Sequence, residues 1–250
     1  MGSNKDFSVA IVIPARFKSS RFPGKPLAFI SGKQMILRVC ETARLVLPVE
    51  KIFVATDDES IAEVVLSNGY RVIMTSDNCL TGTDRVAEAS KEIDADIIIN
   101  IQGDEPILDP KDIERVINAK RKKFNYVINA YTYLSNLEDP LDINIPKVAL
   151  NEKSELIYIS RASIPAAKDK LIERENYMKQ VCIYAFNKRE LEAFNNFTKK
   201  GYVENLEDIE ILRFFELGIK IYMVETHGKS IAVDTPEDIL KVERAINGIN

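Results

Sequence analysis

Short runs of apolar residues alternate with stretches of helical periodicity over the first half of this chain. These runs, which are mostly apolar, predict strands at residues 9–13, 52–55, 71–74 and 97–101. The stretches of helical periodicity cover residues 34–47, 59–68, 83–93 and 110–122. A continuously apolar strand is typical of a sheet that is covered on both faces, as parallel sheets are. The alternation therefore predicts an α/β fold with a mostly parallel sheet flanked by helices.

The second half of the chain is less regular. Its patterns predict strands at residues 126–134, 145–150, 181–186 and 219–224. They predict helices at residues 206–217 and 236–246. Residues 135–180 are polar and contain several prolines, which indicates an insertion with substrate or subunit contacts. No internal repeat or low-complexity linker divides the chain, so we expect a single domain over residues 1–250.

The charge balance and the few histidines and cysteines exclude several classes of function. Lys and Arg total 34 against 38 Asp and Glu, whereas proteins that bind nucleic acid or membrane surfaces need a surplus of cations. His227 is the one histidine, and Cys40, Cys79 and Cys182 are too far apart for a zinc or disulfide framework. No apolar run approaches the roughly 20 residues of a membrane span, and no signal peptide opens the chain. We therefore expect a cytoplasmic protein that binds neither nucleic acid nor membrane.

A loop rich in cations follows the first predicted strand. Residues 14–26 (PARFKSSRFPGKP) contain Arg16, Lys18, Arg21 and Lys25, together with two serines and a glycine. Guanidinium groups, an ammonium group and backbone N–H groups together bind polyphosphate. The loop lacks the G-x-x-x-x-G-K-[S/T] pattern of a Walker A motif. A solvated basic turn would have the same composition, but the position after a buried strand favours an anion site.

Two acidic motifs are candidates for a metal site. QGDEP at residues 102–106 follows the fourth predicted strand, and VDTPED at residues 233–238 precedes the last predicted helix. Mg²⁺ takes one or two carboxylates and completes its shell with phosphate and water oxygens. Either motif is also an ordinary helix start. If the two motifs meet in space, Asp104 and Asp234 are candidate ligands of one ion.

A third motif, TGTDR at residues 81–85, lies between a predicted strand and a predicted helix. Its hydroxyls and the N–H groups of the helix start suit the edge of a ribose or a base. A capped turn without any ligand would have the same sequence, so the motif alone does not decide between the two.

Taken in order, the motifs resemble those of the 3-deoxy-manno-octulosonate (Kdo) cytidylyltransferases, or CMP-Kdo synthetases. The matching segments are PAR and PGKP within 14–26, ATDD at 55–58, GTDR at 82–85, QGDEP at 102–106, SRASIP at 160–165 and VDTPED at 233–238. The resemblance extends over about residues 8–246. It implies a nucleotide-diphospho-sugar transferase-like α/β fold, with a sugar-binding and dimer-contact subregion at about 130–225. It also implies a Mg²⁺-dependent homodimer that converts CTP and a sugar acid into CMP-sugar and pyrophosphate.

The resemblance also implies roles for individual residues. The catalytic residues would be Arg16, Lys25, Asp104 and Asp234, of which Asp104 and Asp234 would hold Mg²⁺. The CTP-binding residues would be Ala15, Arg16, Arg21, Lys25, Thr83, Arg85 and Gln102. The residues that bind the sugar acid would be Arg161, Gln180, Glu207, Glu210 and Ile211. A metal can lower the pKa of a bound hydroxyl, so this chemistry needs no histidine base.

Two positions depart from the family pattern in the expected sugar pocket. Gln180 stands where the family has histidine and Ile211 where it has glutamine, whereas Glu207 and Glu210 match. The acceptor is therefore Kdo, a modified octulosonate such as an 8-amino form, or another carboxylate-bearing compound. A CTP-binding paralogue without catalysis is a further alternative. A nucleotidyltransferase for another base would typically carry a G-x-G-T-R loop, which this sequence lacks.

Overall fold

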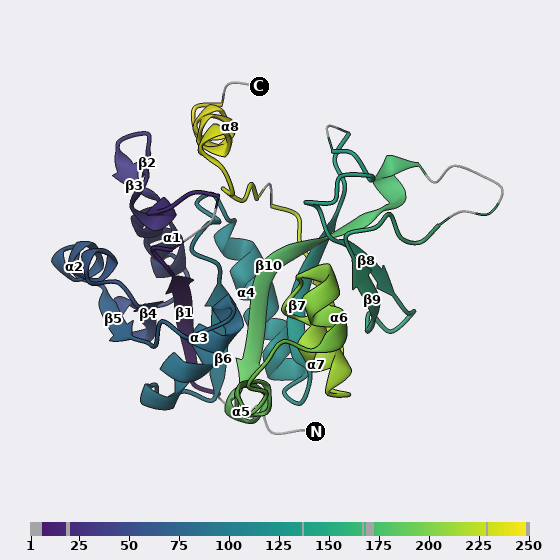
Figure 1. Cartoon of the computed structure of the whole chain (residues 1–250), viewed down its shortest axis with the longest axis horizontal. Helices are drawn as coiled ribbons and strands as arrows, with labels where there is room; N and C mark the ends of the chain where they lie inside the picture. Colours follow the sequence, from purple (N-terminus) through teal and green to yellow (C-terminus); the bar gives the residue numbers. More distant parts are fainter. Residues whose placement is uncertain are drawn as a thin grey trace.

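A computed structural model describes residues 7–18, 21–136, 138–166, 168, 173–228 and 230–248, so Ser19 and Ser20 of the basic loop lie outside it. A mixed sheet runs through its centre in the order β11–β7–β10–β6–β1–β4–β5, and β8 and β9 extend from β10 (Figure 1). In chain order the strands of this sheet are β1 (Val9–Ala15), β4 (Ile52–Thr56), β5 (Arg71–Met74), β6 (Ile97–Ile101), β7 (Val127–Tyr133), β8 (Lys147–Leu150), β9 (Leu156–Ser160), β10 (Met178–Asn187) and β11 (Ile221–Glu225). A separate hairpin pairs β2 (Phe29–Ile30) with β3 (Lys33–Gln34).

The first half of the chain builds the parallel part of the sheet, as predicted. Strand β1 pairs in parallel with β4 on one side and with β6 on the other, and β4 pairs in parallel with β5. The chain thus places β4 and β5 on one side of β1 and then crosses to β6 on the other side. Open α/β sheets bind ligands at such a switch point, outside the carboxyl ends of the strands.

Strand β10 runs antiparallel to both of its neighbours in the sheet, β6 and β7. Its register pairs Ile183 with Ile101, the last residue of β6, so the start of β10 extends beyond the carboxyl end of β6. Residues Met178 and Lys179 of this overhang pair with β8, which in turn pairs with β9. We call β8 and β9 the arm; Figure 1 shows it projecting beside the central sheet.

Helices cover both faces of the sheet because the strands are apolar on both faces. Helices α1 (Met35–Arg44), α2 (Glu59–Ser67) and α4 (Pro110–Lys122) pack on the face of Ile11 and Ile13. Helices α3 (Gly82–Ala89), α5 (Lys188–Asn195) and α7 (Leu212–Glu216) pack on the face of Ala10 and Val12. None of the helices in the described residues is long and apolar enough to span a membrane.

The C-terminal segment returns to the carboxyl ends of the first strands. Helix α8 (Pro236–Ile246) begins at Pro236, as predicted, and carries Val242 into a small apolar cluster with Ile30, Met35 and Val233. This cluster holds the residues just before α8 beside the start of α1. Asp234 is thereby brought to the same edge of the sheet as the loop that follows β1.

The prediction of one helix over residues 206–217 is wrong. Helix α6 (Tyr202–Glu207) ends because Asp208 adopts a left-handed conformation with φ 50°, and α7 begins only at Leu212. Asp tolerates this conformation better than most residues. Strand β9 and helix α5, which lie in the less regular half of the chain, are also absent from the elements that the sequence predicts.

A buried ion-pair network fixes the segment that contains α6 and α7. The Arg213 guanidinium is fully buried; its Nε donates to Glu204 Oε2 at 2.7 Å and its Nη1 donates to Asp84 Oδ1 at 2.7 Å. Asp84 also forms a capping box with Thr81 at the start of α3. Arg213 therefore fastens the α6–α7 segment to the N-terminal end of α3.

We expect Arg213→Leu to lower the free energy of unfolding by about 3–5 kcal/mol, because it leaves two buried carboxylates without their cation. Urea denaturation measures this change. The control Lys241→Met removes a cation that is paired with Asp238 at 2.7 Å but largely exposed, and it should cost less than about 1 kcal/mol. Equal losses in the two variants would contradict a special role for the buried network.

Candidate active site

A cavity of about 560 Å³ lies at the carboxyl ends of β1 and β6. Its walls come from the loop after β1, the start of α3, the residues after β6 and the segment before α8. Residues just before β8, just after β9 and just after α6 complete them. The residues that line it include Ala15, Arg16, Arg21, Lys25, Cys79, Thr81, Gly82, Arg85, Gln102, Asp104, Asn144, Arg161, Asp208 and Asp234. The motifs that were separate in the sequence thus meet in one place, at the position that the strand order predicts.

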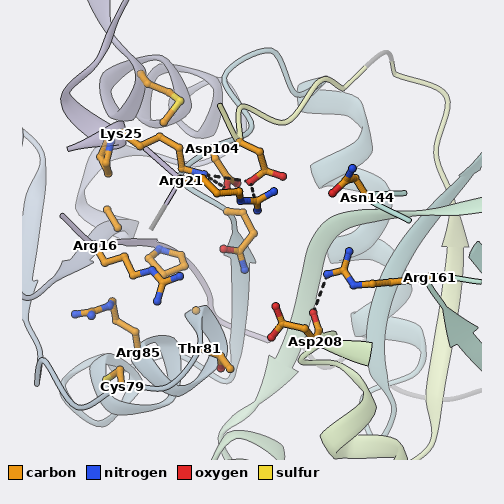
Figure 2. Close-up of a pocket in the computed structure, with 18 of the residues that line it drawn as sticks. Arg16, Arg21, Lys25, Cys79, Thr81, Arg85, Asp104, Asn144, Arg161 and Asp208 are labelled. Carbon is orange, nitrogen blue, oxygen red and sulfur yellow. Dashed lines mark hydrogen bonds and ion pairs between the residues drawn. The ribbon is translucent and has the colours of Figure 1, made fainter. Parts of the chain in front are cut away.

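The cavity has two ends of different character (Figure 2). We call the side lined by Arg16, Arg21, Lys25 and Arg85 the cationic end. We call the side lined by Ile143, Asn144, Arg161 and Asp208 the arm end, because Arg161 directly follows β9 of the arm. The two ends face each other across the cavity in Figure 2.

The loop after β1 needs a glycine to present its cations. Gly24 has φ +70°, and its N–H donates to the carbonyl oxygen of Phe17 at 2.9 Å. This turn folds the loop back on itself and directs Lys25 toward the strand ends. Arg16 has no hydrogen bond or ion pair with any other described residue, so its guanidinium is available to a ligand.

Asp104 and Asp234, which are 130 positions apart, converge on one ammonium group. Lys25 Nζ lies 2.6 Å from Asp104 Oδ2 and 3.7 Å from Asp234 Oδ1, and Arg21 Nη2 lies 2.9 Å from the same Asp234 oxygen. The backbone also joins the two segments, since the N–H of Val233 donates to the carbonyl oxygen of Asp104 at 2.9 Å. The predicted convergence of the two acidic motifs is therefore present.

Gly103 permits this close approach of the strand ends. A Cβ added at Gly103 would lie 2.8 Å from the carbonyl oxygen of Pro14, which is closer than real Cβ contacts. Any other residue here would push the QGDEP segment away from the end of β1. The glycine therefore lets Asp104 reach Lys25.

The donor set at Asp104 and Asp234 suits a hard divalent cation that also binds its substrate. Both carboxylates border the cavity, with 27% and 38% of their side chains exposed. Among the described residues no cluster of three or more His, Cys, Asp or Glu forms a closed metal cage. Mg²⁺ typically uses one or two carboxylates together with substrate phosphates, which matches an open pair of this kind.

Glu105, the other acid of the QGDEP motif, does not join this pair. Its side chain is buried, does not line the cavity and accepts a hydrogen bond from the Ser230 hydroxyl. Burial raises the pKa of Glu105 to about 7, against the opposing effect of the Ser230 hydrogen bond. Within these two motifs, the carboxylates that border the cavity are therefore Asp104 and Asp234.

Arg85 lines the cavity but is already held by the protein. Its Nη2 lies 3.3 Å from Asp57 Oδ2, and its Nη1 donates to the hydroxyl of Thr75. Thr83, which was expected to contact CTP, is 1% exposed and turned away from the cavity lining. Thr81 and Gly82 take its place at the start of α3. Gln102 also lines the cavity, and its side-chain amide packs against Gly82.

Arg161 holds the segments of the arm end together, because its guanidinium donates hydrogen bonds to three backbone carbonyl groups. Its Nε donates to Glu207 O at 2.6 Å, its Nη1 to Ile143 O at 2.9 Å and its Nη2 to Asp208 O at 3.0 Å. The Glu207 carboxylate accepts hydrogen bonds from the Ser160 hydroxyl and the Arg161 backbone N–H. Arg161 therefore shapes the arm end, and each of its guanidinium nitrogens is engaged.

Of the five residues expected to bind the sugar acid, Arg161 alone lines the cavity. Gln180 Nε2 donates to Asn129 Oδ1 at 3.0 Å, and Glu207 and Glu210 accept hydrogen bonds from neighbouring segments. Ile211 is 1% exposed and lies in the apolar core, so the substrate contact expected for it does not match its position. An aliphatic residue is what that buried position requires.

Several residues of the cavity wall could not be predicted from sequence motifs. Asn144 and Ile143 belong to an irregular loop, and Asp208 lies at the break between α6 and α7. None belongs to a motif that chemistry would single out. Their position depends on the arm and on the left-handed conformation of Asp208, neither of which was predicted.

Comparison with known proteins identifies the class of enzyme. A family model described as Cytidylyltransferase matches residues 10–221. This match confirms the nucleotidyltransferase class that the sequence motifs predicted.

Individual relatives narrow the family further. The 3-deoxy-manno-octulosonate cytidylyltransferase of Syntrophotalea carbinolica is 38% identical over 97% of this chain and 100% of its own length. The 8-amino-3,8-dideoxy-manno-octulosonate cytidylyltransferase of Shewanella oneidensis is 40% identical over 96% of this chain and 98% of its own. The solved structure of CMP:2-keto-3-deoxy-manno-octonic acid synthetase with CTP superposes with a TM-score of 0.88 at 36% identity, covering 96% of this chain and 99% of the other. The chain therefore belongs to the cytidylyltransferase family, and within it to the branch of the 3-deoxy-manno-octulosonate cytidylyltransferases.

We expect Arg161→Lys to loosen the loop before β8, which contains Ile143 and Asn144. A lysine ammonium cannot bind three carbonyl groups with the planar geometry of a guanidinium. The N–H groups of Asn144 and Ile145, which donate to Asp142 oxygens at 2.8 and 3.2 Å, should exchange with solvent at least about tenfold faster. Hydrogen exchange measured by NMR or mass spectrometry checks this. Arg71→Lys, which alters a guanidinium bonded to the carbonyl oxygen of Glu50, is a control that should leave this loop unchanged. Unaltered exchange in Arg161→Lys would contradict the bracing role.

Proposed function

We propose that the protein transfers CMP from CTP to the anomeric hydroxyl of Kdo or its 8-amino derivative and releases pyrophosphate. The observation that carries the proposal is the convergence of Asp104 and Asp234 on Lys25, beside Arg16 and Arg21 at the strand ends. Full-length relatives named for these two acceptors support it.

The cationic end suits the triphosphate of CTP. Attack on an α-phosphate requires that the negative charge of the phosphates is neutralised and that the nucleophile is held in line. Arg16 forms no ion pair with another described residue, and the ion pairs of Arg21 and Lys25 are made with carboxylates that border the cavity. These side chains would bind the β- and γ-phosphates and stabilise the pyrophosphate as it leaves.

Asp104 and Asp234 would hold a Mg²⁺ ion when the substrates bind. The ion would polarise the α-phosphate and lower the pKa of the acceptor hydroxyl. The chain's histidine, His227, does not line the cavity and its side chain is 61% exposed. The protein therefore offers no imidazole as a general base there, and its contribution is to neutralise charge and to orient the substrates.

The arm end would receive the sugar acid. Asn144 and Asp208 supply an amide and a carboxylate there, which suit hydroxyl groups and, in the 8-amino derivative, a cationic amine. Burial of the Asp208 side chain is slight, and its carboxylate pairs with Lys200 Nζ at 2.5 Å. The two acceptors are therefore both candidates, and the assay below distinguishes them.

Dimerisation and a cytoplasmic location stay predictions. Ile157 on β9 and Tyr202 and Leu206 on α6 are between 53% and 77% exposed, which is the type of apolar surface that a second copy would cover.

We expect pyrophosphate release when the protein is incubated with CTP, Mg²⁺ and either Kdo or 8-amino-Kdo. The ratio of kcat/KM for the two acceptors identifies the preferred one. CTP binding without turnover of either acceptor would contradict the proposed reaction and favour a non-catalytic paralogue. A failure to bind CTP, measured by calorimetry, would contradict the nucleotide assignment as well.

Asp104→Asn should reduce kcat by about 100-fold or more, because the substitution removes one charge that orients the metal and substrate. Its thermal midpoint should stay within a few degrees of the wild type, since the ion pair with Lys25 is partly exposed. Asp77→Asn, at an exposed turn outside the cavity, is the matched control. Full activity of Asp104→Asn would exclude Asp104 from the reaction.

Divalent cations alone should bind weakly, because Lys25 and Arg21 already neutralise both carboxylates. We expect Lys25→Met to bind Mn²⁺ at least about tenfold more tightly than the wild type in the absence of CTP, as seen by electron paramagnetic resonance. Lys33→Met, which breaks the pair between Lys33 and Glu41 away from the cavity, is the control. Equal Mn²⁺ affinity in Lys25→Met and the wild type would show that Lys25 does not compete with the metal.

A further inference from the structure

Gln102 lines the cavity with a side-chain amide that is fixed at one of its two atoms. Its Nε2 donates to Glu210 Oε1 at 3.0 Å. None of the described residues donates to its Oε1, and this oxygen is not among the buried polar atoms without a partner. The amide nitrogen therefore points into the protein, and the amide oxygen faces the cavity.

Packing against α3 keeps the Gln102 amide in place. A Cβ added at Gly82 would lie 3.0 Å from both Nε2 and Oε1 of Gln102, so the amide group lies directly against the start of the helix. The glycine leaves just enough space for it. The side chain can exchange the positions of its nitrogen and oxygen by rotation, but it has little room to move aside.

Glu210 decides which of the two orientations Gln102 adopts. Glu210 Oε2 accepts the backbone N–H of Thr83 at 2.9 Å, which fixes the carboxylate against the first turn of α3. An ionised carboxylate can only accept hydrogen bonds. Its other oxygen therefore requires an N–H group from Gln102, and the reverse orientation would place two oxygens against each other.

We propose that Glu210 is a positioning residue that sets the polarity of Gln102, so that the cavity presents a carbonyl acceptor at this point. The ligand group opposite Gln102 is then a hydrogen-bond donor, either a hydroxyl or an amino group. This inference rests on the proposed function, in which both CTP and the sugar acid carry such groups. Glu210 itself does not touch the substrate.

The isosteric variant Glu210→Gln tests the proposal. The oxygen of the new amide can still accept the Thr83 N–H, but its nitrogen then donates toward Gln102. Gln102 would rotate and present its Nε2 to the cavity, so that a donor faces the donor of the ligand. We expect the affinity for that ligand to fall roughly 10- to 100-fold.

The exchange variant Gln102→Glu with Glu210→Gln restores the original polarity with nearly the same atoms. Its residue 102 accepts from residue 210 through one carboxylate oxygen and offers the other oxygen to the cavity. Affinity should return to within a few-fold of the wild type. Gln102→Glu alone places two carboxylates together and should bind no better than Glu210→Gln. Glu192→Gln, on the exposed side of α5, is the control that should change nothing.

Two measurements identify which ligand supplies the donor. If the donor belongs to CTP, calorimetric binding of CTP without sugar weakens in Glu210→Gln and recovers in the exchange variant. If it belongs to the sugar acid, CTP binding is unchanged, and the KM of the sugar acid rises and recovers. Either pattern supports the polarity role, and the recovery is what a merely structural glutamate would not give.

Three results would overturn the inference. The first is that neither CTP affinity nor the KM of the sugar acid changes by more than about twofold in Glu210→Gln. The second is a loss that the exchange variant does not recover. The third is a collapse of the thermal midpoint in Glu210→Gln, which would show that the residue chiefly holds α3 in place. Failure of the proposed function would appear already as absent turnover in the wild type, whereas failure of this inference appears only in the variants.

Discussion

The charge balance around Lys25 is the interaction on which the rest of the cavity depends. Two carboxylates and the carbonyl oxygen of Val233, 2.8 Å from Nζ, surround one ammonium group. The ammonium group offsets the repulsion between Asp104 and Asp234, and Arg21 adds a second positive charge at Asp234. Lys25 thus joins the first loop of the sheet to the last segment of the chain. Phosphate groups of a ligand would bind the same ammonium group. Ligand binding and the packing of these segments therefore depend on a single positive charge.

The α6–α7 segment is the second organising element, because three of its glutamates serve three different neighbours. Glu204 neutralises Arg213 in the core, Glu207 holds the backbone at Arg161, and Glu210 holds Gln102 and the start of α3. A continuous helix would place residues three apart on one face. The left-handed Asp208 interrupts that face, so Glu207 contacts the backbone at Arg161 whereas Glu210 contacts Gln102 and the start of α3.

The sequence predicted the parts of the fold that periodicity and local chemistry determine. Residues 9–13 are continuously apolar and residues 97–101 nearly so, and they form β1 and β6, while Pro110 and Pro236 each begin a helix where proline is favoured. The resemblance predicted that Arg16, Lys25, Asp104 and Asp234 share one site, and all four residues line one cavity. Periodicity could not predict the break at Asp208, since a single backbone rotation leaves the apolar spacing of residues 206–217 unchanged. A sequence pattern also cannot distinguish Glu210, which supports Gln102, from a residue that contacts substrate. Both would be polar residues near one cavity. Ile211 is the clearest case: its burial in the core depends on packing between α7 and the sheet, which no local pattern encodes.

The reversed direction of β10 has a consequence for how acceptor preference can change. Because β10 enters the sheet from the cavity side, its overhang pairs with β8 and places the arm beyond the carboxyl end of β6. Residues 142–144 precede β8 and residue 161 follows β9, so none of them belongs to the parallel strands. Under the proposed function, the acceptor preference can therefore change through residues next to the arm, while Lys25, Asp104 and Asp234 at the strand ends stay unchanged.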